Sequence, residues 1–466
     1  MLELIQSVNS AVNNFIWGVP AMICIIGVGL LLTIKTRFLQ IRKFPYAMKE
    51  TIGRAFKKQD ASDGSMTPFQ AVCTALASTV GTGNIAGVAG AIAIGGPGAV
   101  FWMWMLALLG SASAFIESTL AQLYKRKGKT SFYGGPAYYM KYGLGKGWMG
   151  ILFAVLMIIT FGFAYNSVQS NTICLAWQKA FGIEPATMGI ALTVLTLLII
   201  FGGIHRVAKF SSTVVPVMAV IYLLIAVGVV VWNITSLPKV LLTIVENAFG
   251  FNQAAGGVLG VTVIQGIKRG LFSNEAGEGS APNAAAVATV SHPVKQGLIQ
   301  ALGVFTDTLV VCSCTAFIIL VSGVDLTASN GIQLTQDALT HEIGSIGNPF
   351  VAVMIWLFAF SSIIGNYYYG ETNVRYIRDS KLGVFVYRLA VAAMVMVGAV
   401  VSLDFAWSFA DITMALLTLC NLAAIVLLSR QAVFLLKDYR QQKKEGKNPV
   451  FTKDKMPEIA DKLEAW

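Results

Sequence analysis

Two stretches of the sequence place small and polar residues inside long apolar runs. The first is GTGNIAG at positions 81–87, and the second is GLFSNEAGEGSAPN at positions 270–283. Glycines weaken a helix, and a backbone group left unpaired in lipid is costly unless protein, ion or solute satisfies it. Freed N–H groups suit a carboxylate, and freed carbonyls suit Na⁺, a hard cation that prefers oxygen. Each stretch taken alone is equally typical of close helix packing.

Ionisable residues inside apolar runs are costly and point to function. Asp307, in GVFTDTLVV, is a candidate cation ligand or else a structural acid held by hydrogen bonds. Glu117, in SASAFIEST, lies nearer the inner end of its run, where bracing a broken helix is the favoured interpretation. Lys268 and Arg269 precede the second stretch, and two interpretations stay open for them. They pair with an acidic group in an outer gate, or they extend outward to the membrane surface.

Hydroxyl, amide and aromatic side chains gather in two other runs. Ser361 and Ser362, in FAFSSIIGNYYYGE, are adjacent hydroxyls in the middle of a run, with Asn366 one turn later. In isolation such serines bond their own helix backbone. The run 147–178 carries a polar and aromatic stripe that fits packing and a pocket wall equally well. The stripe consists of Phe161, Phe163, Tyr165, Asn166 and Gln169.

These side chains require a membrane-spanning scaffold to position them. Of the 466 residues, 56% are hydrophobic and 12% are charged, whereas soluble chains carry about 25% charged residues. Apolar runs of about 20 residues, long enough to cross the hydrocarbon core, recur through the chain. We predict an all-α integral membrane protein of about 11 transmembrane helices. They are expected at 15–34, 67–94, 98–123, 147–178, 186–203, 211–232, 255–290, 296–322, 348–372, 382–403 and 405–429.

The basic residues are distributed unevenly between the two predicted faces. Of 34 Lys and Arg residues, 29 fall in alternate connections and in the C-terminal tail. This positive-inside pattern predicts an N-terminus outside and a cytoplasmic C-terminus. It also excludes a nucleic-acid partner, because the net charge of +11 is not gathered into a binding patch. The expected partners are the lipid bilayer and a small-molecule solute, and no obligate protein partner is inferred.

The two interrupted runs lie five spans apart. Corresponding Gly- and Pro-interrupted segments in two halves are typical of a transporter built as an inverted repeat. Spans two to six would then pair with spans seven to eleven, giving a 5+5 inverted repeat with two broken helices. The predicted units are an extra N-terminal helix at 1–35, a basic cytoplasmic amphipathic loop at 36–66, repeats at 67–233 and 255–430, an outer amphipathic segment at 234–254, and a cytoplasmic tail at 431–466.

The connections between spans carry further expectations. The basic loop interleaves aromatic residues and is expected to lie along the anionic inner leaflet. Residues 238–251 read as an outer amphipathic helix, and residues 323–347 as a long outer loop that could act as a lid. The polar C-terminal tail is expected to be partly disordered.

The sequence predicts a carrier rather than an enzyme or a channel. HExxH, GxSxG and Walker-like motifs are absent, and the six cysteines form no CxxC pair. The histidines, His205, His292 and His341, are expected in loops, away from any metal cluster. A channel would need a continuous polar pore face, whereas the polar residues here cluster at one depth.

Several motifs resemble one transporter family. GGPGAVFWMWMLALLG at 95–110 matches the signature of the alanine or glycine:cation symporter family almost residue for residue. VGTGNIAGV, GLFSNEAGEGSAPNAAA and YYYGE are similar to other blocks of that family. The resemblance covers essentially the whole chain. It implies a LeuT-type fold in a prokaryotic plasma (inner) membrane, with Na⁺-coupled, or in some members H⁺-coupled, uptake of small amino acids such as alanine and glycine.

The resemblance also implies which residues meet the solute. TVGTGN is similar to the unwound motif in the first core helix of this fold. Thr82, Gly83 and Asn84 are therefore expected to meet the substrate carboxylate and an ion near it. The other residues that the resemblance brings to the pocket are Phe272, Ser273, Asn274 and Gln169.

A Na⁺ site follows from the same resemblance. The carbonyls of Ala77 and Val80, with the hydroxyls of Ser361 and Ser362, would form the ion site shared by LeuT-type symporters. Asp307 falls near the place where related carriers hold an ion ligand. Na⁺ is thus the expected coupling ion.

One position departs from the family pattern. Many members carry Trp where this chain has Asn366, so that the motif reads GNYYYGE. A Trp there would restrict the pocket to glycine or alanine, whereas Asn is smaller and offers a hydrogen-bonding amide. Alanine is expected first on family frequency, with glutamine or another larger polar amino acid as the alternative.

Overall fold

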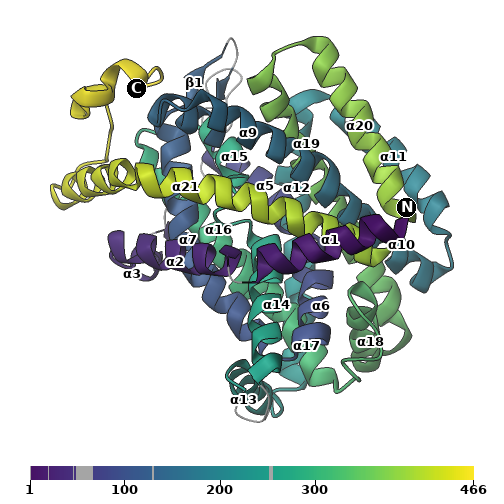
Figure 1. Cartoon of the computed structure of the whole chain (residues 1–466). Helices are drawn as coiled ribbons and strands as arrows, with labels where there is room; N and C mark the ends of the chain where they lie inside the picture. Colours follow the sequence, from purple (N-terminus) through teal and green to yellow (C-terminus); the bar gives the residue numbers. More distant parts are fainter. Residues whose placement is uncertain are drawn as a thin grey trace.

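Helices make up nearly all of the computed structural model, which describes residues 2–18, 20–42, 44–45, 47–48, 67–128, 131–250 and 256–466. Within these residues a two-stranded antiparallel ribbon is the exception, and it pairs Arg126 with Tyr133 and Lys127 with Phe132. Figure 1 shows the helices gathered into one bundle.

The elements follow one another in an order that places the two interrupted stretches between helices. Along the chain these are α1 (Leu2–Trp17), α2 (Pro20–Lys35), α3 (Leu39–Arg42), α5 (Pro68–Thr79), η1 (Gly83–Gly87), α6 (Val88–Gly95), α7 (Ala99–Leu123), β1 (Arg126–Lys127), β2 (Phe132–Tyr133), α8 (Pro136–Tyr138), η2 (Tyr139–Gly143), α9 (Gly147–Met157), η3 (Ile158–Tyr165), α10 (Asn166–Phe181), α11 (Pro185–Ile200), α12 (Gly203–Trp232), α13 (Leu237–Ala248), α14 (Gly256–Asn274), α15 (Ala281–Val287), α16 (Pro293–Phe305), η4 (Thr306–Cys312), α17 (Ser313–Ser322), α18 (Ile332–Ile343), η5 (Gly344–Ile346), α19 (Gly347–Ile377), α20 (Lys381–Val400), α21 (Leu403–Lys444), η6 (Lys453–Lys455) and η7 (Pro457–Lys462).

The membrane-spanning character of the helices agrees with the sequence. Among the described residues, 8 helical stretches are long and apolar enough to cross a membrane, and a bent pair makes a ninth. The two other predicted spans correspond to α11, which has 16 residues, and to α14 followed by α15. Exposed apolar side chains such as Leu224 and Trp232 on α12 suit contact with lipid. The all-α membrane fold class is confirmed.

Local sequence signals set the ends of several helices. Helix α5 begins with a capping box, in which Gln70 N donates to the Thr67 hydroxyl and Thr67 N donates to Gln70 Oε1. Helices α10 and α17 end at Gly182 and Gly323, whose φ angles of 68° and 70° lie in the left-handed region that favours glycine. These signals let short connections join long helices.

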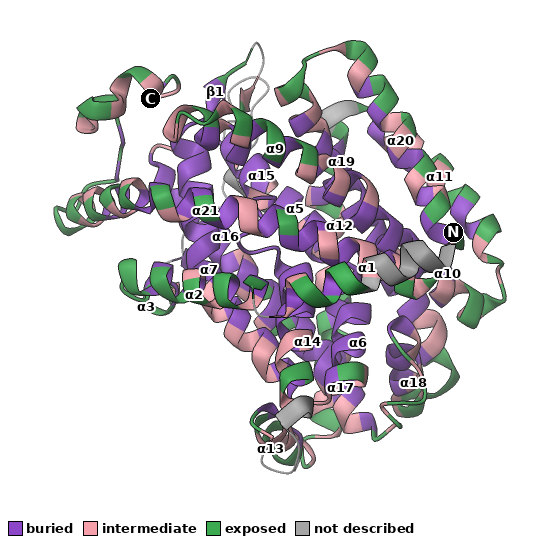
Figure 2. Ribbon diagram, in the orientation of Figure 1, coloured by how far each residue is buried: buried purple, intermediate pink, exposed green. Residues whose placement is uncertain are grey.

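The interrupted helices lie in the interior of the bundle. The segment η1 packs against α14, and α19 packs against both α5 and α10. Figure 2 shows α5, α6, α15 and α16 mostly buried, whereas α13, α20 and the end of α21 alternate between buried and exposed residues. The bundle thus surrounds both breaks with protein.

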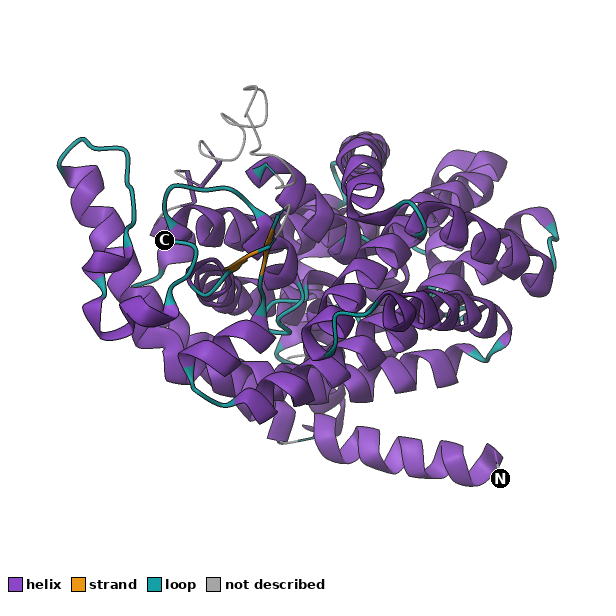
Figure 3. Ribbon diagram, turned by 90° about the horizontal axis from the view of Figure 1, so that it is seen from above, coloured by secondary structure: helices purple, strands orange, loops and turns teal. Residues whose placement is uncertain are grey.

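The first predicted span divides into two helices. Helix α1 ends at Trp17 and α2 begins at Pro20, and both pack along α21. Figure 3 shows the N-terminal helix running along the outside of the bundle. The single extra helix predicted at 1–35 is therefore two helices in the structure.

Three expectations about connecting segments are wrong, and one is confirmed. Residues 323–347, predicted as a loop, include the helix α18 and are largely helical, and His341 lies on that helix. His205 likewise falls within α12 rather than in a loop. The tail is ordered: Phe451 N donates to Ser291 O, which ties the tail to the bundle. Helix α13 confirms the amphipathic helix predicted at 238–251.

The tail is ordered because it carries buried apolar residues that its polar composition concealed. Leu463 is 2% exposed, and Trp466 Nε1 donates to Gln122 O at 2.9 Å. The predicted basic loop at 36–66 falls mostly outside the described residues.

Candidate functional site

The first interrupted stretch opens the helix between α5 and α6. Helix α5 ends at Thr79, and the chain turns by 45° before Gly83–Gly95 resumes. The break requires glycine, because a Cβ added at Gly83 would lie 2.7 Å from Ser273 Cα in α14. The two interrupted helices therefore touch backbone to backbone at this point.

Asn84 closes the break and connects it to the second half of the chain. Its Oδ1 accepts from Gly81 N at 2.8 Å, so it pairs a backbone N–H that the helix leaves open. Its Nδ2 donates to Asp307 Oδ1 at 2.6 Å and to Ser273 Oγ at 3.0 Å. A single amide thereby links α5, α14 and η4.

Asp307 is fully buried and is surrounded by neutral donors. Its Oδ2 accepts from Ser273 Oγ at 2.7 Å and from Thr308 Oγ1 at 3.1 Å. Asn274 Nδ2 donates to the same Thr308 hydroxyl at 3.0 Å, which extends the network to the second break. Among the described residues, no Lys or Arg pairs with Asp307. This arrangement fits a cation ligand and a hydrogen-bonded structural acid alike.

The four residues predicted to hold Na⁺ lie together. Ser361 Oγ is 3.4 Å from Ala77 O, and Ser362 Oγ is 3.5 Å from Val80 O. Both hydroxyls also donate back to one carbonyl of their own helix, that of Phe358. Neutral oxygens from two helices thus converge, and such a donor set suits a hard monovalent cation.

The glycine before Thr82 keeps that space free. A Cβ added at Gly81 would lie 2.2 Å from Ser362 Oγ and 3.0 Å from Gln169 Oε1. Gln169 in turn accepts from Thr82 N at 3.1 Å. The candidate ion ligands and the candidate substrate ligands are therefore neighbours.

One polar atom at the first break has no partner. The Thr82 hydroxyl is buried without a hydrogen bond, and Thr82 itself is 0% exposed. An unpaired buried hydroxyl costs free energy, about 1–3 kcal/mol in general. A substrate carboxylate at the break would accept from it and remove this cost.

An aromatic stack borders the same region. The Phe272 ring lies 4.5 Å from the Tyr165 ring and 4.7 Å from the Trp407 ring, measured between centroids. Of the predicted stripe on the run 147–178, Phe161 packs on Tyr165 with 4.7 Å between the ring centroids. The stripe therefore supplies packing at Phe161 and a polar wall at Gln169.

Asn366 bonds to residues on two neighbouring helices. Its Oδ1 accepts from Ser78 Oγ at 2.7 Å, and its Nδ2 donates to Asn166 Oδ1 at 3.1 Å. The Asn366 amide thus joins α5, α10 and α19. Every predicted site residue is buried, and their networks adjoin one another.

Two acidic residues of the second break are more deeply involved than the sequence indicated. Glu275 Oε1 lies 2.8 Å from Ser78 Oγ, and both oxygens of Glu278 lie 3.0 Å from Tyr165 Oη. Glu275 has a φ of 54°, a strained backbone region for a residue with a side chain. Both carboxyl groups are buried, and neither pairs with a cation among the described residues. The sequence feature that could have identified both residues is their position inside the interrupted stretch itself.

Glu117 performs the role that its position favoured. Its Oε1 accepts from Gly277 N at 3.3 Å, and its Oε2 accepts from Asn421 Nδ2 at 2.7 Å. The carboxyl group thus braces the second break against α7 and α21.

The two basic residues before the second break form ion pairs rather than extending outward. Arg269 binds both oxygens of Asp411, at 3.0 and 3.1 Å, and Lys268 Nζ lies 2.8 Å from Asp411 Oδ2. The Arg269 guanidinium also lies 4.1 Å from the centre of the Trp407 ring. A pocket of about 180 Å³ adjoins this cluster and is lined by Asn330 among others. Arg269, Asp411 and Trp407 all line this pocket, so the cluster, the pocket and the aromatic stack adjoin one another.

The described residues contain no group of three or more His, Cys, Asp or Glu side chains placed to hold a metal ion. The cysteines are all free thiols.

Comparison with known proteins finds relatives of this chain in sequence and in fold. Residues 2–453 match the sodium:alanine symporter family. The chain is 52% identical to the probable sodium/glutamine symporter GlnT of Bacillus subtilis, over 97% of this chain and 95% of the relative. It is 50% identical to the amino-acid carrier protein AlsT of the same organism, over 98% and 97%. The fold is similar to that of the Eremococcus coleocola manganese transporter, with a TM-score of 0.52, 14% identity, and coverage of 85% and 84%.

Proposed function

The chain belongs to the sodium:alanine symporter family, and from this premise we propose that it imports a neutral amino acid together with Na⁺ by alternating access. The electrochemical Na⁺ gradient would supply the free energy, and its electrical part is about 2.3 kcal/mol per elementary charge for each 100 mV of membrane potential. Rocking of one helix bundle against the rest would expose the central site to either side in turn. The proposed orientation puts the N-terminus outside and the C-terminus in the cytoplasm.

The observation that carries the proposal is the pairing of an ion-type site with an unpaired hydroxyl at one helix break. The carbonyls of Ala77 and Val80 face the hydroxyls of Ser361 and Ser362. Thr82, two residues further along the chain, holds its hydroxyl unpaired. Na⁺ bound at the first group would hold α5 against α19 and fix the break that receives the carboxylate. Such shared stabilisation links the two binding equilibria.

Asn366 favours glutamine as a second candidate substrate beside alanine. The family resemblance implies a Trp at this position in many members, whereas the Asn366 amide takes part in hydrogen bonds on both sides. A polar solute side chain would find amide and hydroxyl partners here rather than an aromatic face. The 52% identity to a protein named as a glutamine symporter supports the same candidate.

Uptake into proteoliposomes tests the proposal. Purified protein in liposomes is given labelled alanine or glutamine under an inward Na⁺ gradient, with an equal K⁺ gradient as the control. We expect the labelled amino acid to accumulate above its outside concentration under the Na⁺ gradient and not under the K⁺ gradient. An ionophore that collapses the Na⁺ gradient should abolish this accumulation. Equilibration without accumulation, or accumulation that survives the ionophore, would contradict Na⁺ symport. Competition by the unlabelled amino acids then ranks alanine against glutamine.

Protons are the second candidate for the coupling ion, because of the geometry at Glu275. With Asn366 oriented to donate to Asn166, the single Ser78 proton faces two acceptors, Glu275 Oε1 and Asn366 Oδ1. Both contacts are satisfied at once when Glu275 carries a proton and donates it to Ser78. A buried carboxyl group without a cation partner is cheaper in this neutral form.

An imposed pH gradient distinguishes the two ions. In Na⁺-free proteoliposomes, proton coupling predicts amino-acid accumulation driven by an inward proton gradient, with loss of that accumulation in Glu275→Gln. The matched control is Glu458→Gln, since Glu458 lies on the C-terminal tail. If uptake by the native protein does not depend on the pH gradient, protons are excluded as the driving ion.

A further inference from the structure

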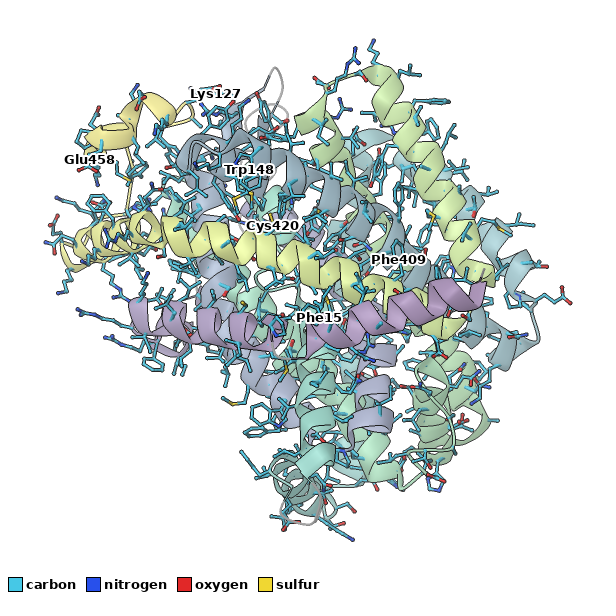
Figure 4. All side chains as sticks on the ribbon, viewed as in Figure 1. Phe15, Lys127, Trp148, Phe409, Cys420 and Glu458 are labelled. Atoms are coloured by element: carbon cyan, nitrogen blue, oxygen red, sulfur yellow. The ribbon has the colours of Figure 1, made fainter. Side chains whose placement is uncertain are left out.

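A large cavity lies where α2 and α3 meet the end of α21. It has a volume of about 640 Å³, and none of its lining residues belongs to either interrupted stretch. Figure 1 shows α2 beside α21 at this end of the molecule, and Figure 4 shows the side chains that project there. The residues that line it are Lys35, Arg37, Leu39, Arg42, Leu298, Val433, Leu436, Lys437, Tyr439, Arg440, Gln441, Lys443 and Lys444.

The charged lining of this cavity is entirely basic. Seven Lys and Arg residues line it, and none of the lining residues is acidic. Within the described part of the chain, no acidic partner pairs with six of them, Lys35, Arg37, Arg42, Lys437, Arg440 and Lys444. Like charges held close together raise the free energy unless an anion joins them.

Two of the basic residues are held in place by the protein. Lys35 Nζ donates to Ser429 Oγ at 2.9 Å, and Arg440 Nη2 donates to Thr36 O at 3.3 Å. Arg440 Nε is buried and has no hydrogen-bond partner. A donor fixed in this way is prepared for an acceptor that comes from outside the chain.

The turn between α2 and α3 is strained. Arg37 and its neighbour Phe38 have φ angles of 57° and 54°, in the left-handed region that residues with side chains rarely adopt. Two such residues in succession cost free energy, and strain of this kind persists at places where a ligand or contact uses the geometry. The turn brings Arg37 to the cavity wall.

The remaining wall of the cavity is apolar. Leu39 and Leu298 are buried and also line a second, shallow hollow, in which the Phe44 and Phe305 rings lie 5.2 Å apart. Lys35 is the last residue of the candidate membrane span Ala11–Lys35, so the basic wall lies at the level where lipid headgroups meet the hydrocarbon. The apolar wall adjoins it on α3 and α16.

We propose that this cavity is a binding site for an anionic phospholipid. Its phosphate would contact the basic wall, chiefly Arg42, Lys437 and Lys444, and its acyl chains would follow Leu39 and Leu298 toward the shallow hollow. Phosphate against Lys and Arg, with apolar surface beside it, is the recognition chemistry of headgroup pockets between membrane helices. The lipid would join α2, near the start of the chain, to α21, near its end.

Native mass spectrometry of the purified full-length protein in detergent tests the site. Three titrations are compared: phosphatidylglycerol, phosphatidylcholine, and inorganic phosphate without acyl chains. The pocket variant carries Arg42→Gln, Lys437→Gln and Lys444→Gln, all at exposed positions that need no partner to fold. The control variant carries Lys381→Gln, Lys453→Gln and Lys462→Gln, which removes the same charge outside the cavity lining.

We expect phosphatidylglycerol to bind the native protein and the control variant with equal affinity, and to bind the pocket variant at least about tenfold more weakly. The native protein should also bind phosphatidylglycerol more tightly than phosphatidylcholine. Equal phosphatidylglycerol binding by the pocket and control variants would overturn the site. Inorganic phosphate that binds as tightly as the lipid would overturn the lipid as its occupant in favour of a soluble phosphate. If the triple variant fails to fold, Lys437→Gln against Lys453→Gln gives the same comparison with one charge each.

Discussion

Replacing Ser362 by alanine tests the ion site most directly. Ser362 Oγ is 3.5 Å from Val80 O and 3.1 Å from the carbonyl of Phe358 in its own helix. The substitution removes one of the four oxygens that face the space kept open by Gly81. Helix geometry survives, because the lost bond runs within one helix and its carbonyl keeps its backbone partner. The change should therefore act on ion binding rather than on folding.

The size of the effect follows from the contact that is lost. A hydrogen bond or dipolar contact to a charged group contributes about 1.5–3 kcal/mol, and each 1.4 kcal/mol is a factor of about ten in affinity. We therefore expect the Na⁺ concentration for half-maximal uptake to rise by about tenfold or more. The maximal rate at saturating Na⁺ should fall less than the affinity.

The assay measures initial uptake in proteoliposomes against Na⁺ concentration, together with the Na⁺-dependent rise in melting temperature. Ligand binding stabilises the folded state in proportion to RT ln(1 + [L]/Kd), so weaker binding reduces that rise. Ser167→Ala is the matched control, since Ser167 Oγ donates to Phe163 O at 2.9 Å within its own helix. An unchanged Na⁺ dependence in folded Ser362→Ala would refute the site.

Three further substitutions have distinct expected outcomes. Asn366→Trp should reduce glutamine uptake more than alanine uptake, and equal loss of both would remove the pocket-size argument. Gly83→Ala should abolish transport and lower thermal stability, because its Cβ would lie 2.7 Å from Ser273 Cα. The control Gly260→Ala should change neither transport nor stability, because nothing lies within 4 Å of its new Cβ. Asp411→Ala leaves two buried cations without their carboxylate and should lower the free energy of unfolding by about 3–5 kcal/mol, measured by chemical denaturation. A decrease in that free energy below about 1 kcal/mol would show that water already screens the cluster.

Much of the architecture could be predicted because its physical cause is local. Lipid offers no partners to the backbone, so glycines, Thr82 and Asn84 inside an apolar run indicate either a break or close helix packing, and the matching stretch five spans later favours the break. The alternation of basic and apolar segments likewise reports the spans without any knowledge of packing. The family motifs added the pairing of Ala77 and Val80 with two serines, which the structure places together.

Other features could not be predicted because the partners lie far apart in sequence. Asn84 meets Asp307 across 223 positions, and Arg269 meets Asp411 across 142. An isolated Lys or Arg in an apolar run either extends to the membrane surface or pairs with an acidic group, and only the position of an acidic partner decides between the two. The same holds for Glu275, whose burial depends on how α5 packs against the second break.

The sequence by itself determined where the chain crosses the membrane, where two crossings break, and to which family it belongs. Those properties depend on the free energy of each segment in lipid and on short motifs, which are local quantities. Only the tertiary structure decided that Glu117 braces the second break, that the basic pair closes on Asp411, and that the tail ends docked at Gln122. These outcomes depend on which side chains long-range packing brings within hydrogen-bonding distance, and composition carries no record of that geometry.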